Sequence, residues 1–209
     1  DSTWLFVVRD ITERRRSEAR IQYLAYYDTL TGLANRQLFV RELRRAIRAC
    51  ERKARRVAVL FVDLDRFKRI NDTLGHAVGD ALLQSVARRL ETCVRPEDFV
   101  ARTERVEPPS QVRVARLGGD EFTLIVENIN GAEDAAHVAS RVLEALGEPF
   151  QVGEEELVVT ASIGISMYPI DDVDLDTLIR HTDMAMYRSK SHGRATYSFF
   201  SEDLSAAVT

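Results

Sequence analysis

Two glycines and two acids, Gly118-Gly119-Asp120-Glu121, interrupt a run of apolar and alternating residues in the second half of the chain. The residues on either side, 112–117 and 123–126, are typical of strands, so the pattern predicts a β-hairpin with carboxylates at its tip. Glycine at such a tip permits a tight turn, or the close approach of a ligand to the backbone. Carboxylates presented there suggest chemistry on a cation and a polyphosphate.

A second acidic group follows the most apolar stretch of the chain. Residues 57–62 are apolar on both faces, which is typical of a central strand, and Asp63 and Asp65 come directly after them. Strand positions separated by one residue point the same way, so both carboxylates should face one side. A helix N-cap would also explain acids at this place. If the hairpin pairs beside this strand, Asp63 meets Asp120 or Glu121, and oxygen ligands without Cys or His favour Mg²⁺ or Mn²⁺.

A third group is cationic and ends the last long helical pattern. Lys190 and Arg194 are four residues apart, and Gly193 is expected to end the helix between them. Cations at a helix C-terminus often do no more than complement the helix dipole. Beside a carboxylate–metal site, they are instead candidates to bind the outer phosphates of a triphosphate.

The composition is that of an ordinary globular domain. The chain has 209 residues, of which 45% are hydrophobic and 30% charged, and its net charge is −4. This acidic balance argues against nonspecific binding of nucleic acid. No apolar run is long enough to span a membrane and no signal peptide is visible, so we expect no membrane segment in this chain and a cytoplasmic location. Cys50 and Cys93 lack metal-ligand spacing and are expected to be reduced, buried thiols.

The periodicity of apolar residues predicts helices and strands in mixed order. Helical patterns lie at 36–53, 79–92, 132–146 and 175–189, and strands at 57–62 and near 157–167, in addition to the hairpin. We therefore expect an α+β fold in which helices flank a central, mostly antiparallel sheet.

Five motifs in a fixed order resemble those of the GGDEF domain, the diguanylate cyclase module of bacterial signalling. The matching stretches are residues 28–36, 63–80, 115–122, 162–166 and 190–194. The resemblance covers about residues 26–200 and is far more specific than the short signature alone. It implies the GGDEF, nucleotide-cyclase palm-like fold with the signature on a β-hairpin.

The resemblance also implies a reaction. Two domains of a homodimer each hold one GTP with Mg²⁺ or Mn²⁺, and each 3′-hydroxyl attacks the other α-phosphorus to give cyclic di-GMP and two pyrophosphates. By position, Asp63, Asp120 and the carbonyl of Leu64 would bind the metal. Glu121, together with Asp120, would orient or deprotonate the 3′-hydroxyl. The residues implied for GTP are Asn71 and Asp80 for guanine, Lys68, Lys190, Arg194 and the backbone near Phe67 for the phosphates, and Gly119 for room beside the nucleotide.

One part of the sequence departs from the family pattern. Many members carry an inhibitory product site, Arg-x-x-Asp, shortly before the signature, and residues 109–112 at that distance do not match. A matching Arg95-Pro96-Glu97-Asp98 stands 14 residues earlier. We infer an insertion at roughly 103–116, which should be a loop because it contains Pro108-Pro109. The inhibitory site at Arg95 and Asp98 is then expected to be weakened or absent, and the loop could instead affect turnover.

The two ends resemble parts of other domains. Residues 1–9 resemble the last strand of a PAS sensor and 10–27 its signalling helix. Residues 28–200 are assigned to the GGDEF domain, and 201–209 to a linker that leads to an EAL phosphodiesterase domain. An active diguanylate cyclase is therefore favoured. The alternative is a GTP-binding regulatory module that controls an adjacent EAL domain, with the insertion as its main support.

Overall fold

The structure, a computed structural model, describes residues 20–21, 23–53, 55–94 and 111–201 and the single residues 13 and 203. Several features expected from the sequence lie outside the described residues. These are the PAS-like strand at 1–9, more than half of the signalling helix at 10–27, the Arg95–Asp98 motif and most of the linker at 201–209.

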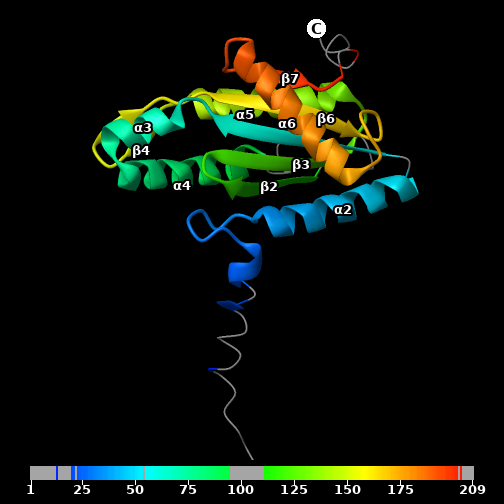
Figure 1. The fold of residues 1–209 in the computed structure, drawn as a ribbon, viewed down its shortest axis with the longest axis horizontal. Helices are drawn as coiled ribbons and strands as arrows, with labels where there is room; N and C mark the ends of the chain where they lie inside the picture. The colour runs from blue at the N-terminus through cyan, green and yellow to red at the C-terminus, as the bar shows by residue number, and fades with distance from the viewer. Residues whose placement is uncertain are drawn as a thin grey trace, which may run out of the picture.

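The described residues form a five-stranded sheet flanked by helices, with a separate two-stranded hairpin (Figure 1). Along the chain the elements are α2 (Arg36–Lys53), β1 (Arg56–Leu64), α3 (Phe67–Leu74), α4 (His76–Cys93), β2 (Gln111–Gly118), β3 (Glu121–Ile129), α5 (Ala132–Gly147), β4 (Phe150–Val152), β5 (Glu155–Leu157), β6 (Ala161–Tyr168), α6 (Leu175–Ser191) and β7 (Tyr197–Phe199). The sheet order is β2-β3-β1-β6-β7, and its neighbours are antiparallel except for the parallel pair β6–β7. The predicted α+β fold with a mostly antiparallel sheet is confirmed.

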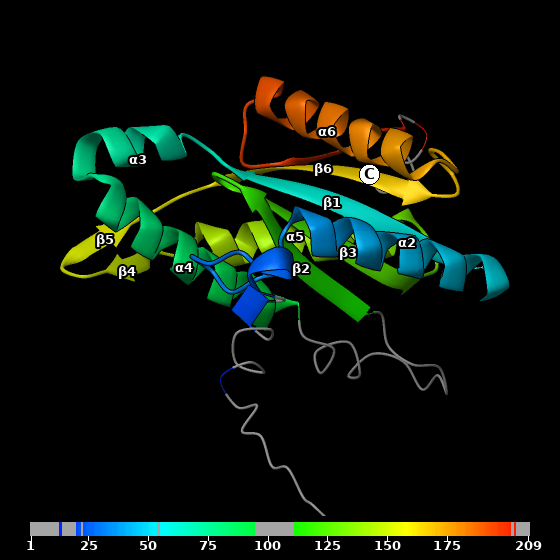
Figure 2. The same cartoon turned by 60° about the horizontal axis from the view of Figure 1, so that its bottom comes forward.

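The middle strand, β1, is buried on both faces. Val59 and Phe61 belong to a hydrophobic cluster with α2 and α6, whereas Leu60 and Val62 belong to the opposite cluster with α4 and α5. Figure 2 shows the resulting layers, with α2 and α6 on one side of the sheet and α4 and α5 on the other. Side chains alternate along a strand, so Asp63 near the end of β1 points to the face that α6 covers.

Helix α6 lies close to β6 because small residues form the contact. A Cβ at Gly164 would lie 2.2 Å from both the carbonyl oxygen of Thr182 and the amide nitrogen of Met186. A larger residue therefore cannot fit without moving the helix. Beside it, the buried hydroxyls of Ser166 and Thr182 are 2.5 Å apart, and both bond to the carbonyl of Leu178. This contact fixes the height of α6 above the sheet and thereby the position of its last turn.

The sequence located the long helices well and the short elements poorly. The bounds of α2 agree with the predicted 36–53. The strand predicted near 157–167 is only partly correct, because β5 ends at Leu157 in a separate hairpin with β4, and β6 begins at Ala161. Helix α3 was missed, since it has eight residues and starts after Arg66, whose left-handed φ of 60° and lack of a side-chain cap give no start signal.

The prediction of a loop at 103–116 is wrong for its last residues. Gln111–Gly118 form β2, which pairs with β3 from Gln111 opposite Glu127 to Gly118 opposite Glu121. The apolar alternation of this stretch continues the hairpin, and β2 is an edge strand, where prolines just upstream disturb no inner ladder. The part of the inferred insertion that precedes residue 111 lies outside the described residues.

The remaining expectations concern the core and the membrane. Phe39, Phe67 and Phe122 are buried in the hydrophobic core. Cys50 is buried but Cys93 is only half-buried, so the expectation of two buried thiols is wrong for Cys93. Among the described helices, none is both long and apolar enough to cross a membrane.

Candidate active site

The two acidic groups meet at one end of the sheet. In the antiparallel register of β1 and β3, Asp63 stands directly opposite Glu121. The amide of Leu64 donates a hydrogen bond of 3.3 Å to the carbonyl of Asp120, which holds the turn against the end of β1. The predicted hairpin is therefore confirmed, and it brings the signature acids beside Asp63 as the sequence led us to expect.

The cationic group reaches the same place from α6. The Lys190 ammonium lies 2.7 Å from Oδ2 of Asp63, whose side chain is only 10% exposed. Burial raises the pKa of Asp63, the bond from Lys190 partly opposes that rise, and the nearby charges of Asp120 and Asp65 add to it. Asp63 is thus a buried anion whose ionised form depends on a cation close to it.

Glu121 lies at the exposed rim of this site. Its pKa is raised by partial burial and then by repulsion from Asp63, Asp120 and Asp183, while Lys190 lowers it. Asp183 comes from α6, two turns before Lys190. Three other carboxylates therefore lie near enough to Glu121 to raise its pKa, and Lys190 offsets their charge only in part, which favours binding of an additional cation.

Arg116 holds the signature turn in place. Its guanidinium donates to the carbonyl of Gly119 from Nε at 3.1 Å and from Nη2 at 2.7 Å, and from Nη1 to Asp28 at 2.8 Å. Asp28 also accepts bonds from the amide and hydroxyl of Thr31. Burial raises the pKa of Asp28, but the bonds from Thr31 and Arg116 outweigh burial and bring it below its usual value. The segment before α2 and the signature turn are therefore joined through one buried guanidinium.

The residues expected to bind guanine lie at the junction of α3 and α4. The amide of Gly75 donates to the carbonyl of Asn71 at 2.9 Å, which closes α3 against the start of α4. A Cβ at Gly79 would lie 1.9 Å from Oδ1 of Asn71, so this position admits only glycine while Asn71 keeps its place. Asp80 follows on the exposed side of α4. The structure thus places Asn71 and Asp80 on two helices that meet at one junction.

The residues expected to bind phosphates come from three segments. Phe67 is buried at the start of α3 and offers only its backbone, while Lys68 beside it is exposed. Helix α6 ends at Ser191, so Arg194 lies on a turn as predicted, with its side chain 46% exposed. Around Gly119 there is open space, because a Cβ there would meet no atom within 4 Å.

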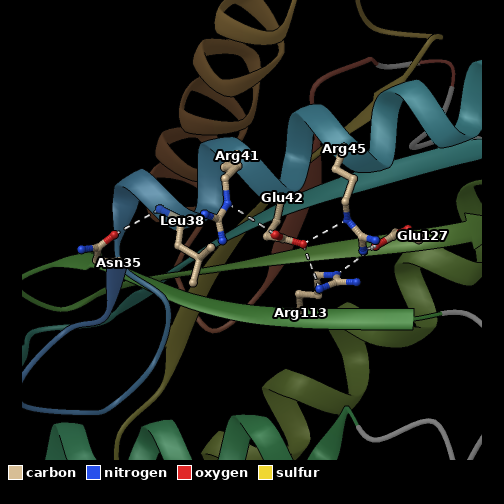
Figure 3. A network of polar contacts seen from close by, with 7 residues as sticks. All are labelled: Asn35, Leu38, Arg41, Glu42, Arg45, Arg113 and Glu127. Carbon is tan, nitrogen blue, oxygen red and sulfur yellow. Dashed lines mark hydrogen bonds and ion pairs between the residues drawn. The ribbon is translucent and has the colours of Figure 1, made fainter. Parts of the chain in front are cut away.

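An ion-pair network supports the far end of the hairpin. Figure 3 shows Glu42 of α2 facing Arg113 of β2. Nη1 of Arg113 lies 2.9 Å from Oε2 of Glu42. Arg113 also binds Glu127 of β3 at 3.0 Å, and Arg45 bridges both acids from α2. Arg41 lies 3.7 Å from Glu42 at the edge of the network. The network attaches α2 to both strands, at positions remote from the signature turn.

The residues present fit a hard divalent cation that is shared with a ligand. Among the described residues, no group of three or more His, Cys, Asp or Glu side chains is arranged to hold a metal alone. Asp63 and Asp120 could supply two carboxylates, and Lys190 already places a positive charge on Asp63. Mg²⁺ commonly binds in this way, with one or two carboxylates and with substrate phosphates completing its shell.

Sequence reasoning missed the contacts of three residues of this region. Arg116 and Asp65 stand within motifs that were recognised, but no sequence signal shows that their charges are buried and bonded to distant turns. Asp183 sits in an exposed helical pattern, and only the packing of α6 reveals its nearness to Glu121. Arg95 and Asp98, the expected inhibitory pair, lie outside the described residues.

The fold is that of a GGDEF domain. The family model described as "Diguanylate cyclase, GGDEF domain" matches residues 25–107 and 109–196, so the chain belongs to the GGDEF family. The GGDEF domain of TpbB (YfiN) from Pseudomonas aeruginosa superposes with a TM-score of 0.75 and 32% identity, covering 88% of this chain and 99% of that one. A sensory box/GGDEF family protein from Caulobacter crescentus gives a TM-score of 0.70 and 38% identity, over 80% of this chain and 99% of that one.

Relatives in sequence include longer signalling proteins. The bifunctional diguanylate cyclase/cyclic di-GMP phosphodiesterase MucR of P. aeruginosa is 40% identical over 195 residues, which are 93% of this chain and 26% of MucR. An uncharacterized signaling protein of Caulobacter vibrioides is 40% identical over 207 residues, 98% of this chain and 24% of that protein. The chain therefore spans about a quarter of the length of these relatives, and its family places it in cyclic di-GMP signalling.

Proposed function

We propose that this domain is a diguanylate cyclase, which condenses two GTP into cyclic di-GMP and two pyrophosphates across a homodimer. The observation that carries the proposal is the meeting of Asp63, Glu121 and Lys190 at one end of the sheet. A buried carboxylate, a rim carboxylate with a raised pKa and an ammonium are the groups that a nucleotidyl transfer at an α-phosphorus needs.

Each group has a distinct task in this proposal. Asp63 and Asp120, with the carbonyl of Leu64, hold Mg²⁺ or Mn²⁺, which when bound neutralises charge on the phosphates. Glu121 takes up the proton of the attacking 3′-hydroxyl, and its raised pKa makes it a stronger base than an ordinary glutamate. Lys190 leaves Asp63 when the nucleotide binds and pairs with the phosphates instead.

The rest of the site would bind and orient the nucleotide. Asn71 and Asp80 read the guanine edge, because a carboxylate accepts from N1–H and the 2-amino group, which adenine does not offer. Lys68, Arg194 and the backbone at Phe67 take the β- and γ-phosphates. Gly119 leaves room beside the sugar and α-phosphate. One domain has one such half-site, so two copies must face each other before either 3′-hydroxyl has a target.

A regulatory role without turnover is the second candidate. Relatives whose names give only the phosphodiesterase activity carry the same kind of domain, namely NbdA of P. aeruginosa at 36% identity and PdeR of Escherichia coli at 35%. In this role the domain would bind GTP and control an EAL domain elsewhere in the full-length chain. β2 pairs with β3 as far as the signature, with one register shift between Arg116 and Gly118, so the hairpin forms despite the inferred insertion that is the main support for this role.

The test is product formation by the purified chain with GTP and Mg²⁺ at several protein concentrations. We expect cyclic di-GMP to rise more than linearly with protein, since the active species is a dimer. An Asp120→Ala, Glu121→Ala double variant should form none. Glu144→Gln, an exposed change on α5 across the sheet, is the matched control and should behave as wild type. Bound GTP without product at any concentration would refute the cyclase and favour the regulatory role.

A further inference from the structure

The turn that follows α6 has an unusual backbone. Gly193, Arg194 and Ala195 have φ of 108°, 66° and 49°, so two consecutive residues with side chains adopt the left-handed region. L-residues other than glycine rarely adopt this conformation, and they keep it only where the surroundings enforce it. Something must therefore hold this turn in the shape that presents Arg194.

Asp65 is one of the residues that hold it, beside Ser189, whose carbonyl accepts a hydrogen bond of 3.2 Å from the amide of Arg194. The amide of Ala195 donates to Oδ2 of Asp65 at 3.1 Å, across 130 positions of the sequence. The same carboxylate accepts bonds of 2.7 Å from the hydroxyls of Thr160 and Ser162, and its side chain is only 3% exposed. Nε of Arg194 lies 3.9 Å from Oδ1. Asp65 is thus fixed by its own partners and can in turn fix the turn.

The backbone of Arg194 is fixed, but its guanidinium is not. The turn forms one wall of a pocket of about 510 Å³, which Arg66 and Arg69 of α3 also line. Arg194 is 46% exposed, and at 3.9 Å its contact with Asp65 is longer than a hydrogen bond. Its backbone is held by Asp65, while its guanidinium remains able to exchange one anion for another.

We propose that Asp65 is a positioning residue for nucleotide binding: it anchors the turn 193–195 and thereby sets Arg194 for the terminal phosphates. The inference rests on the proposed role of Arg194 in binding GTP. Because Asp65 acts through Arg194, removing the Asp65 carboxylate should weaken the binding of ligands that carry β- and γ-phosphates. The affinity for ligands that lack these phosphates should be unchanged.

The experiment measures the affinity of the full chain for 3′-deoxy-GTP, which cannot react, and for GMP, both with Mg²⁺. We expect Asp65→Ala and Arg194→Ala each to weaken the binding of 3′-deoxy-GTP about tenfold and the binding of GMP by less than about twofold. The double variant should be no weaker than Arg194→Ala alone. Asp65→Asn should lie within about threefold of wild type, since its oxygen can still accept from Ala195 and its NH₂ can donate to Ser162.

Three results would overturn the proposal. The first is an equal loss of affinity for GMP and for 3′-deoxy-GTP in Asp65→Ala, which would indicate general damage to the site. The second is full additivity in the double variant, which means that Asp65 does not act through Arg194. The third is an Arg194→Ala variant with unchanged affinity. Formation of cyclic di-GMP by the wild-type chain tests the proposed function separately, so the two can fail independently.

A second measurement does not depend on any variant folding. In the wild-type chain without nucleotide, the amide of Ala195 should exchange its hydrogen slowly, because it is bonded to a buried carboxylate. Exchange at the rate of an unprotected turn amide would mean that the anchor is absent in solution and would refute the proposal.

Discussion

The guanidinium of Arg116 donates two hydrogen bonds, of 3.1 and 2.7 Å, to the carbonyl of Gly119 in the same hairpin. Its third bond goes to Asp28, at 2.8 Å, in the segment that precedes α2. The signature turn is therefore not positioned by its glycines alone. Its shape depends on a charge that is 8% exposed and on a loop far away in the sequence.

Replacing Arg116 should impair both stability and turnover. Arg116→Met leaves the Asp28 carboxylate and the Gly119 carbonyl without this donor, and we expect a loss of about 3 kcal/mol in the free energy of unfolding. A displaced turn also misplaces Asp120, so turnover should fall by about 100-fold. Urea unfolding and cyclic di-GMP formation measure the two effects. Arg88→Met, which changes an exposed arginine on α4, should alter neither. Near-normal turnover in Arg116→Met would contradict the positioning role.

Arg113 provides a contrast on the same strand. It pairs with Glu42 and with Glu127, whose side chain is 11% exposed, but these contacts lie at the end of the hairpin away from the signature. Arg113→Met should destabilise the chain by about 1–2 kcal/mol, because Glu127 loses its closest cation. Turnover should stay within about twofold, since the turn itself is untouched.

A double-mutant cycle tests the Glu42–Arg113 pair directly. We expect Glu42→Gln to cost about 0.5 kcal/mol, with a coupling of less than about 1 kcal/mol to Arg113→Met, because both partners are partly solvated. The coupling should shrink in 1 M salt, where screening is strong. Coupling that does not respond to salt would show that the pair acts through packing rather than charge.

The ionised Glu121 side chain should lower the stability of the folded chain. Because burial and neighbouring carboxylates raise its pKa, the folded chain disfavours the ionised form. Stability is then lost as pH rises from the ordinary glutamate value of 4.5 through the raised pKa of the folded state. Glu121→Gln removes that loss, so its melting temperature should exceed that of wild type at pH 8, and the difference should nearly vanish at pH 4.5.

Cations and turnover provide the controls for Glu121. Mg²⁺ should narrow the difference in melting temperature at pH 8, because it neutralises the carboxylates that repel Glu121. Turnover by Glu121→Gln should be lost. Glu144→Gln should leave the melting temperature unchanged at both values of pH. A lower melting temperature of Glu121→Gln at pH 8 would mean that Glu121 is stabilised by contacts and not strained by repulsion.

The sequence predicted what is periodic or clustered, and it failed where tertiary contacts decide. Asp63 and Asp120 could be placed together because a central strand and a hairpin have few ways to pair. Asp65 could not be assigned, since its partners Thr160 and Ala195 lie 95 and 130 positions away. Residues 112–116 were assigned both to a strand of the hairpin and to the inserted loop, because the proline pair just before them extended the loop prediction over a strand pattern that an edge strand can accommodate.

The close contact between α6 and β6 at Gly164 provides a test of how the fold positions the site. A methyl group at residue 164 would collide with the backbone of α6, at 2.2 Å from both Thr182 and Met186. Since backbone cannot move aside cheaply, Gly164→Ala should destabilise the chain by about 2–3 kcal/mol. It should also lower turnover, because the shift moves Lys190 away from Asp63.

Gly147, at the end of α5, is the matched control for Gly164. A Cβ there would meet no atom within 4 Å, and its backbone is not left-handed. Gly147→Ala should therefore leave turnover unchanged and stabilise the chain by up to about 1 kcal/mol, through the smaller entropy of its unfolded state. The same substitution should therefore have opposite effects on stability at the two glycines. Urea unfolding measures the stability of each variant, and cyclic di-GMP formation measures its turnover. If Gly164→Ala were as stable and active as Gly147→Ala, α6 would be free to move over the sheet, and its position could not be what places Lys190 against Asp63.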